Sequence, residues 1–286
     1  MNIVVFGAGA IGSLFGAFLS KENNVILVGR PDHVEAVNQN GLKVKGKTSF
    51  NVEIEAVTSI DQIDFTPDVV LLTVKSYDTE EASSEITKLL KNNDAVVLSL
   101  QNGLDNIEKI QKYVENDRIL AGVTTYGSFF SSPGVVEHTG TGDTLLGELN
   151  NESSKRLKKI VKTFNKSGIK TFSSENIQRD IWKKAIVNAC INPITGFFEC
   201  RNGYLLENLV LKNIVKKICE ENLKIVKRQG FDFSKEEIMD ATFTVIKKTS
   251  DNHSSLYQSL QHGKKTEINS INGVLMCYGK KYGIDC

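Results

Sequence analysis

The first residues whose spacing suggests chemistry are three glycines close to the N-terminus. Gly7, Gly9 and Gly12 fit the pattern G-x-G-x-x-G, directly after an apolar run and before a helix-like segment. In such a strand–turn–helix unit the first glycine makes a tight turn, the second lets a pyrophosphate approach the backbone, and the third lets the helix pack on the strand. The helix N-terminus favours the anion. The sequence therefore predicts a dinucleotide site, whose contacts we expect from Gly7, Ala8, Gly9, Ala10, Ile11 and Gly12.

The end of the next apolar strand indicates which dinucleotide binds. NAD-binding proteins usually carry an acidic residue there for the ribose hydroxyl, but this chain has Gly29-Arg30. A guanidinium suits a 2′-phosphate, so we expect NADP. The alternative is that Arg30 is a solvated surface residue and that Asp32 holds the ribose of NAD.

Two further polar residues follow predicted strands of the same sheet. Lys75 follows VVLLTV, and Asn102 follows VVLSLQ. Ligands of open α/β sheets collect at these strand ends, so Lys75 is expected to meet the cofactor and Asn102 to bridge cofactor and substrate. The alternative for each is a polar residue that caps a strand end.

A polar stripe marks an otherwise apolar helix, residues 181–192. Lys184, Asn188 and Asn192 recur at a spacing of four, which places them on one face of a helix that should be buried. Buried polar groups need partners, so the stripe predicts either a hydrogen-bond network between helices or a face toward a polar ligand. Pro193 predicts that the helix ends near Asn192.

A second polar cluster lies in residues 251–273. Ser255 can donate to a carboxylate, and Glu267 begins a helix whose Ile268 and Ile271 have core-like spacing. The alternative is that Ser255 caps a helix and Glu267 only complements a helix dipole.

The elements that must position these residues follow a clear order along the chain. Short apolar strands alternate with helical stretches, which is typical of a parallel sheet covered on both faces. The strands are expected at 3–6, 25–28, 69–74, 95–100 and 119–125. Antiparallel strands are expected at 135–138 and 144–146, joined by the turn TGTGD, then a helix at 152–166 and a strand at 169–172.

The pattern changes to long helices after about residue 174. They are predicted at 176–192, 206–229, 235–248 and 266–282. The expected fold is therefore α/β, with an N-terminal Rossmann-type domain over residues 1–174 and an all-helical C-terminal domain over residues 175–286 that binds substrate and carries the catalytic groups.

Composition limits the classes of function. The 286 residues include 35 basic and 34 acidic ones, so the balance offers no electrostatic footprint for nucleic acid or an anionic membrane. No apolar stretch is long enough for a membrane span. The five cysteines are scattered, which fits a reducing compartment, and we expect a cytoplasmic protein. The four histidines lie far apart and form no metal-binding motif, so no metal is expected.

Over nearly its whole length the chain resembles the ketopantoate reductase family. The segments that carry the resemblance are GAGAIG, VKSYDT, QNGLDN, VEHTGTGDTLLGE, IWKKAIVNACINPITGF, CRNG and SSLYQSLQHGKKTEINSINGVL. The resemblance implies a Rossmann domain and a helical domain with the active site between them. It also implies NADPH-dependent reduction of 2-dehydropantoate to (R)-pantoate, a step towards coenzyme A.

The resemblance also implies roles for individual residues. Lys184 matches the catalytic lysine, although the adjacent Lys183 leaves an ambiguity that the spacing to the asparagines resolves in favour of Lys184. Glu267 matches the acid that orients the substrate hydroxyl and the lysine, and it lies on the cofactor side as well. The matches to substrate-binding positions are Asn102, Asn188, Asn192, Asn202, Asn252 and Ser255, and the cofactor-side matches are Arg30, Lys75 and Asn102.

These expectations define a mechanism and its competitors. A lysine near its ordinary pKa of about 10.4 is charged at neutral pH, so Lys184 would polarise the ketone oxygen and protonate it. The expected ligand is a small 2-keto acid. The competing functions are an NAD(P) reductase of another 2-keto acid and a non-catalytic NADP sensor. The helices at 206–229 and 235–248 offer either a homodimer interface or only the domain core.

Overall fold

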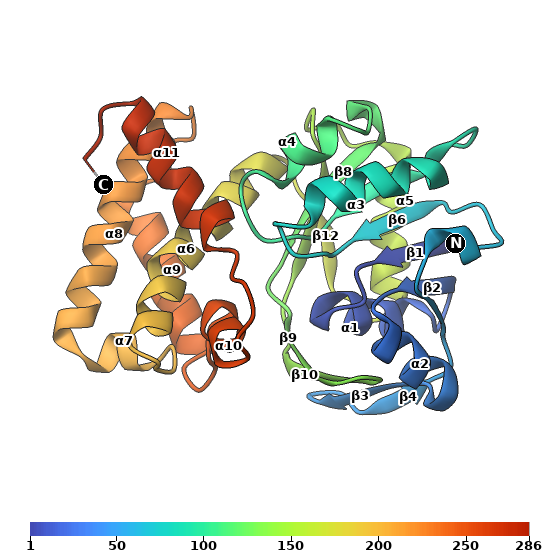
Figure 1. The fold of residues 1–286 in the computed structure, drawn as a ribbon. Coiled ribbons are helices and arrows are strands. Elements are labelled where there is room, and N and C mark those ends of the chain that lie inside the picture. The colour runs from blue at the N-terminus through green and yellow to red at the C-terminus, as the bar shows by residue number, and fades with distance from the viewer. Residues whose placement is uncertain (286) are drawn as a thin grey trace. The chain divides into compact units, whose positions relative to one another are not determined.

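The computed structural model describes residues 1–285 and divides the chain into two compact units (Figure 1). The first unit contains Met1–Gln101 and Asn106–Gln178. The second contains Asn102–Asp105 and the residues from Arg179 onward. The first unit ends at Gln178, four residues after the domain boundary expected at residue 174. The assignment of the short segment Asn102–Asp105 to the second unit was not predicted.

The first unit is built on a mostly parallel sheet. Its strand order is β12-β11-β8-β7-β6-β1-β2-β5, in which only β11 runs antiparallel to its neighbour β8 and carries β12 parallel to itself. The strands are β1 (Asn2–Phe6), β2 (Asn24–Val28), β5 (Glu55–Val57), β6 (Val69–Leu72), β7 (Val96–Ser99), β8 (Ile119–Thr124), β11 (Thr144–Glu148) and β12 (Thr171–Ser173). The predicted α/β class and the five predicted parallel strands are confirmed.

Helices cover both faces of this sheet because alternate residues of each strand point to opposite sides. Val5 and Leu27 belong to one apolar cluster, and Val4 and Ile26 to another. The first cluster lies under α1 (Ala10–Leu19), α2 (Pro31–Asn40) and α5 (Lys155–Lys166). The second lies under α3 (Thr79–Ile86) and α4 (Asn106–Gln111), with 3₁₀ turns at Ile60–Gln62, Thr87–Leu90 and Asn116–Arg118 elsewhere in the unit.

A second, smaller sheet corrects one expectation about strand pairing. It has the order β4-β3-β10-β9 and consists of β3 (Leu42–Gly46), β4 (Phe50–Val52), β9 (Gly127–Ser132) and β10 (Val135–Gly140). The prediction that segments 135–138 and 144–146 pair with each other is wrong. β10 instead forms a hairpin with β9 through a turn in which Gly134 has a φ of +73°, and β11 pairs with β8. The shorter connection decides the pairing, because a tight glycine turn closes a hairpin at little conformational cost.

The second unit is helical, with α6 and α8 as its longest elements (Figure 1). Its helices are α6 (Ile177–Phe197, whose first residues precede the unit boundary), α7 (Tyr204–Glu207), α8 (Leu209–Arg228), α9 (Lys235–Lys248), α10 (Ser255–Gln261) and α11 (Val274–Lys281). The predicted helix at 206–229 is divided because the side chain of Asn208 caps α8 by accepting the N–H groups of Val210 and Leu211, at 2.9 and 3.1 Å. None of the helices in residues 1–285 has the length and apolar character that a membrane span needs.

Two further expectations for the helical unit were wrong. α6 does not end near Asn192 but continues through Pro193 to Phe197. Proline removes the N–H that would bond the carbonyl of Ala189, and the side chain of Asn272 donates to that carbonyl instead, at 3.3 Å. The segment predicted as one helix over 266–282 contains a π-helical turn, Asn269–Gly273, before α11.

Candidate active site

The glycine turn of the first unit requires glycine at two of its three positions. Gly7 has a φ of +107°, and a Cβ there would lie 2.6 Å from the amide nitrogen of Val74. A Cβ on Gly12 would collide with the carbonyl of Gly7, which also accepts a hydrogen bond of 2.8 Å from the hydroxyl of Thr73. A Cβ on Gly9 would meet only the Gly7 carbonyl, at 4.0 Å. The turn is therefore tight on its protein side and open at Gly9, which fits the close approach of a pyrophosphate.

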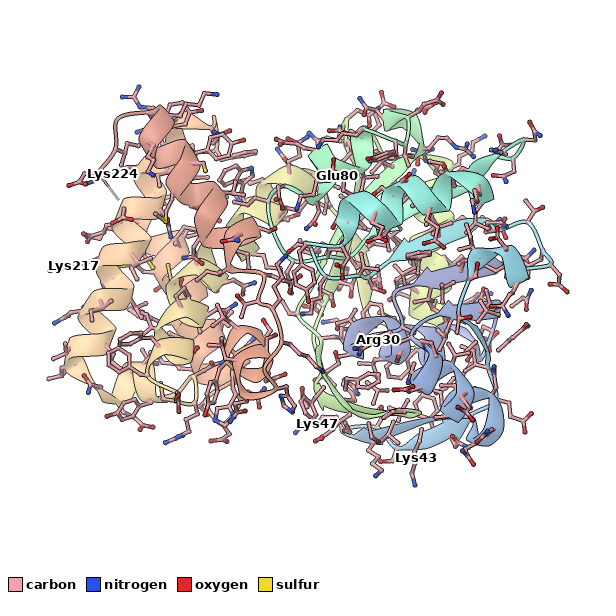
Figure 2. The ribbon with its side chains drawn as sticks, in the orientation of Figure 1. Arg30, Lys43, Lys47, Glu80, Lys217 and Lys224 are labelled. Carbon is pink, nitrogen blue, oxygen red and sulfur yellow. The ribbon has the colours of Figure 1, made fainter. Side chains whose placement is uncertain are left out.

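Arg30 lies at the end of β2 beside this turn. A Cβ on the preceding Gly29 would lie 2.9 Å from the Cβ of Ala8, so the strand end packs against the glycine turn. Arg30 is exposed (labelled in Figure 2), and its guanidinium carbon lies 5.9 Å from the centre of the Phe130 ring. Within residues 1–285 it forms no salt bridge with a carboxylate. Asp32, the alternative ribose ligand, lies in the first turn of α2.

His33 supports this region, and the sequence had assigned it no role. Its Nδ1 accepts the N–H of Gly134 at 3.0 Å, so Nε2 carries the proton and donates to the hydroxyl of Ser13 at 3.0 Å. Burial and, to a smaller extent, the charge of Arg30 together lower the pKa of His33 to about 4. The neutral ring therefore joins α1, α2 and the β9–β10 turn. An isolated histidine in a polar stretch of sequence carries no signal for such a role.

Lys75 and Asn102 belong to different units. Lys75 is exposed on the segment that follows β6. Gln101 stays with the first unit, because its side-chain amide donates to the carbonyl of Val74 at 3.0 Å and to the hydroxyl of Thr79 at 2.7 Å. Asn102, the next residue, belongs to the helical unit. The two candidate residues that follow β6 and β7 therefore belong to different units of the chain.

The polar stripe on α6 consists of side chains that are not hydrogen-bonded to any other described residue. The side chains of Lys184, Asn188 and Asn192 form no hydrogen bond or salt bridge with another of residues 1–285. An internal network between helices, one of the two readings of the stripe, is therefore absent from the described chain. Polar groups on a largely apolar helix that lack protein partners are suited to a polar ligand.

The two adjacent lysines lie in different environments. The ammonium of Lys183 lies 2.9 Å from the carboxylate of Glu237 on α9, which Arg179 also contacts at 2.8 Å. Burial lowers the pKa of Lys184 to about 8, and the carboxylate of Glu267 opposes this shift. The expectation of an ordinary pKa near 10.4 for Lys184 was wrong, because burial disfavours its charged form.

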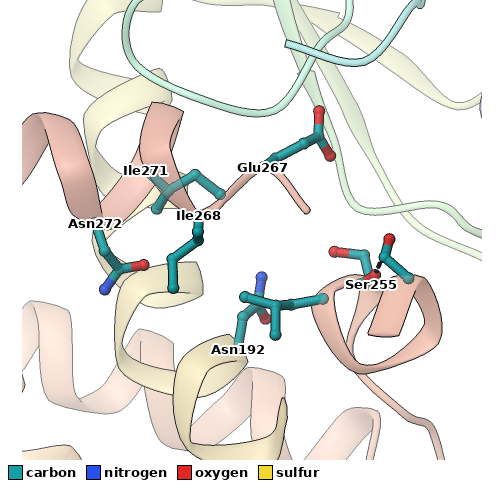
Figure 3. A pocket seen from close by; sticks show the side chains of 8 residues that line it. Asn192, Ser255, Glu267, Ile268, Ile271 and Asn272 are labelled. Atoms are coloured by element: carbon teal, nitrogen blue, oxygen red, sulfur yellow. Dashed lines mark hydrogen bonds between the residues drawn. The ribbon is translucent and has the colours of Figure 1, made fainter. Parts of the chain in front are cut away.

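A pocket in the helical unit gathers several of the predicted residues (Figure 3). Figure 3 shows Asn192, Ser255 and Glu267 around the pocket, with Ile268 and Ile271 on its apolar side. The remaining lining residues are Leu256, Ser259 and Asn272. One side of the pocket can therefore hold polar groups, and the other an aliphatic body.

Three details of this pocket differ from the sequence analysis or were absent from it. The alternative in which Ser255 caps a helix is wrong, because Ser254 caps α10 by accepting the N–H of Tyr257 at 3.2 Å. Ile268, expected in the core, is 39% exposed and lines the pocket. Ser259 and Asn272 were not singled out, although a spacing of four residues from Ser255 was a usable signal for Ser259.

Asn202 and Asn252 do not line the pocket. The side chain of Asn202 is buried and donates to the hydroxyl of Thr249 at 2.8 Å, and its backbone N–H donates to the carbonyl of Asn252 at 2.9 Å. These contacts join the end of α9 to the segment before α7. Residues 1–285 also contain no group of three or more histidine, cysteine or acidic side chains arranged to hold a metal ion.

These groups together suit the reduction of a ketone. An ammonium without a hydrogen-bond partner can stabilise negative charge that develops on a carbonyl oxygen, and then protonate it. The carboxylate of Glu267 favours the protonated form of Lys184 and can accept a hydrogen bond from a hydroxyl group. The glycine turn of the first unit has the local form of a dinucleotide cradle.

Comparison with known proteins agrees with this arrangement. Residues 3–151 match the family model described as ketopantoate reductase PanE/ApbA, and residues 176–286 match its C-terminal model. The 2-dehydropantoate 2-reductases of Pyrococcus abyssi and Pyrococcus horikoshii are 37% and 38% identical, and each alignment covers 100% of this chain and 93% of the relative.

Solved structures show the same fold. A ternary complex of D-mandelate dehydrogenase with NADH and anilino(oxo)acetate aligns with a TM-score of 0.93 at 27% identity, covering 100% of this chain and 94% of that one. A PanE/ApbA family ketopantoate reductase from Ralstonia eutropha aligns with a TM-score of 0.90 at 26% identity, covering 100% and 93%. On the two family models and the full-length relatives, the chain belongs to the ketopantoate reductase family.

Proposed function

We propose that the protein reduces 2-dehydropantoate to (R)-pantoate with NADPH, in the cytoplasm, as a step towards coenzyme A. The observation that carries the proposal is the face of α6 on which the side chains of Lys184, Asn188 and Asn192 form no hydrogen bond or salt bridge with the described residues, while Asn192 and Glu267 line one pocket. Relatives named 2-dehydropantoate 2-reductase support the substrate. Arg30, exposed and without a carboxylate partner in the described chain, supports NADP over NAD.

Each residue has a defined task in the proposed reaction. The reduced nicotinamide supplies a hydride to the ketone carbon when it is bound. The ammonium of Lys184 stabilises the charge on the ketone oxygen and donates its proton there. Ser255 and Asn192 hold the substrate carboxylate by donating hydrogen bonds, and Glu267 accepts from the substrate hydroxyl. The apolar side chains of Ile268 and Ile271 pack against the branched carbon chain.

A second candidate is an NAD(P)-dependent reductase of another 2-keto acid. It is favoured by the similarity to D-mandelate dehydrogenase, whose structure holds NADH and an aryl-substituted oxoacetate. One methylene changes binding in an apolar pocket by only about 1–3 kcal/mol, so related keto acids compete for such a site. In this second candidate, Asp32 would bind the ribose hydroxyl of NAD.

A substrate panel with both nucleotides separates these functions. Nicotinamide absorbance should fall fastest with 2-dehydropantoate and NADPH. Faster turnover of a simpler or aryl keto acid would favour the second candidate, and no turnover with any keto acid would favour a non-catalytic sensor. Lys184→Ala should lower kcat at least 100-fold and leave NADPH affinity intact. Lys183→Ala is the matched control, because Lys183 contacts Glu237 and should retain turnover within a few-fold.

A further inference from the structure

Two irregularities in the helical unit meet at one residue, Asn272. The first is Pro193, which lies inside α6 and cannot donate an N–H to the carbonyl of Ala189, four residues earlier. The side-chain amide of Asn272 donates to that carbonyl at 3.3 Å. Ala189 is fully buried, so its carbonyl would otherwise lack a partner away from water. A side chain thus replaces a backbone bond of the helix that carries Lys184.

The second irregularity is the π-helical turn Asn269–Gly273, which contains Asn272 and begins two residues after Glu267. Isolated π-turns inside helices are rare and occur frequently at functional sites. Here the carbonyl of Ser270 accepts a hydrogen bond from the N–H of Leu104 at 2.8 Å. The hydroxyl of Ser270 donates to the carboxylate of Asp105 at 3.2 Å. Leu104 also packs on the apolar cluster that includes Ala189, Ile271 and Leu275.

The π-turn therefore connects three parts of the candidate active site. It begins two residues after Glu267, it is bonded to α6 through Asn272, and it is bonded to the segment Asn102–Asp105 through Ser270. α6 in turn carries Lys184 five residues before Ala189, on the same rigid helix. The hydrogen bond from Asn272 directly links the turn after Glu267 to that helix, beside the apolar packing of Ile271 on Ala189.

We propose that Asn272 is a positioning residue, which fixes the carboxylate of Glu267 relative to the ammonium of Lys184 by bonding the carbonyl that Pro193 leaves without a donor. The expected effect on turnover rests on the proposed function, whereas the expected effect on the pKa of Lys184 does not. Without this bond the π-turn and Glu267 gain freedom relative to α6. The carboxylate of Glu267 then stabilises the ammonium of Lys184 less, and the pKa of Lys184 falls.

The test uses Asn272→Ala alone and together with Pro193→Ala. Alanine at position 193 restores an N–H that can bond the carbonyl of Ala189, so the double variant keeps that carbonyl satisfied while the link to the π-turn is absent. The denaturant midpoint should therefore fall less on Asn272→Ala in the Pro193→Ala background than in the wild-type background. An equal fall in both backgrounds would overturn the assigned hydrogen bond.

Two measurements separate positioning from stability. NMR titration of the Lys184 side chain in the free protein should show a lower pKa in both variants that lack Asn272, because the support from Glu267 weakens. With keto acid and NADPH, kcat/KM should fall about tenfold or more in both. An unchanged Lys184 titration would refute the proposal, whereas a lowered pKa in a protein that reduces no keto acid would support it and reject only the proposed function.

Asn222→Ala is the matched control. Asn222 is another asparagine that bonds α6, since its amide lies 3.9 Å from the sulfur of Cys190, but it is buried and belongs to α8 rather than to the π-turn after Glu267. We expect this variant to lose stability while the Lys184 titration and kcat/KM stay as in the wild type. A shift of the Lys184 titration equal to that in Asn272→Ala would mean that general loosening of α6 is responsible, and would overturn the specific role of Asn272.

Discussion

The pH dependence of reduction should reveal the electrostatic pairing of Lys184 with Glu267. The lysine must be protonated to donate, and burial lowers its pKa to about 8 against the opposing effect of Glu267. Activity should therefore be high below that pH and fall as the pH rises through it. At pH 7 about 90% of the protein carries the ammonium, and at pH 9 only about 10%.

Substitution Glu267→Gln removes the charge that supports the ammonium. A neighbouring carboxylate typically raises a lysine pKa by about 1–3 units, so even the smallest shift would place the pKa of Lys184 near 7. At pH 8 the charged fraction would then fall from about one half to about one tenth, and kcat/KM would fall about fivefold from protonation alone. The loss should shrink toward pH 6, where both proteins are charged.

The assay is the pH profile of kcat/KM, which reports groups of the free enzyme. Glu237→Gln is the control, because that carboxylate contacts Lys183 and Arg179 in the same unit and should leave the alkaline limb in place. An alkaline limb near pH 10 in the wild type, or one that stays at the same pH in Glu267→Gln, would refute this account of the lysine.

Three further predictions concern the nucleotide unit. Arg30→Ala should raise the KM for NADPH about 10–100-fold and that for NADH little, since a charge-assisted hydrogen bond contributes about 1.5–3 kcal/mol; equal effects on both nucleotides in steady-state assays would contradict the 2′-phosphate role. The pKa of His33 is about 4 in the folded protein against 6.5 ordinarily, so the unfolded chain binds more protons between these values and stability should fall as the pH falls through this window. In urea unfolding at pH 7 and pH 4, the free energy of unfolding of His33→Gln should fall by about 1–3 kcal/mol less than that of the wild type. The same fall in both proteins would exclude His33 as the source of the acid dependence. Gly12→Ala should lower both stability and NADPH affinity, because its Cβ collides with the carbonyl of Gly7, whereas Gly9→Ala should fold normally and lose only affinity, as unfolding and NADPH fluorescence titrations would show.

Local pattern was sufficient to predict most elements of the fold. Continuous apolar runs predicted the buried parallel strands β1, β2, β6, β7 and β8, because such runs are typical of strands covered on both faces. The helix at 235–248 was predicted to the residue, since Ser234 caps it and its apolar spacing is regular. The second sheet was not predicted as a unit, because β3 and β10 lie far apart in sequence and pair only in the folded chain.

Residue type and spacing also determined the main features of the candidate site. The glycine turn needs its glycines for local steric reasons, and the spacing of Lys184, Asn188 and Asn192 places them on one face of any helix. The family followed from the same segments and is confirmed by full-length relatives. These properties depend on neighbours within a few turns of chain, so they can be read without coordinates.

The tertiary structure decided what depends on distant neighbours. Only the folded chain shows that burial lowers the pKa of Lys184, that His33 is held neutral between Ser13 and Gly134, and that Asn102 belongs to the helical unit. It also decided that Pro193 does not end α6, because Asn272, far along the chain, supplies the missing donor. Protonation and hydrogen-bond partners are set by the surrounding atoms, and those atoms come together only when the chain has folded.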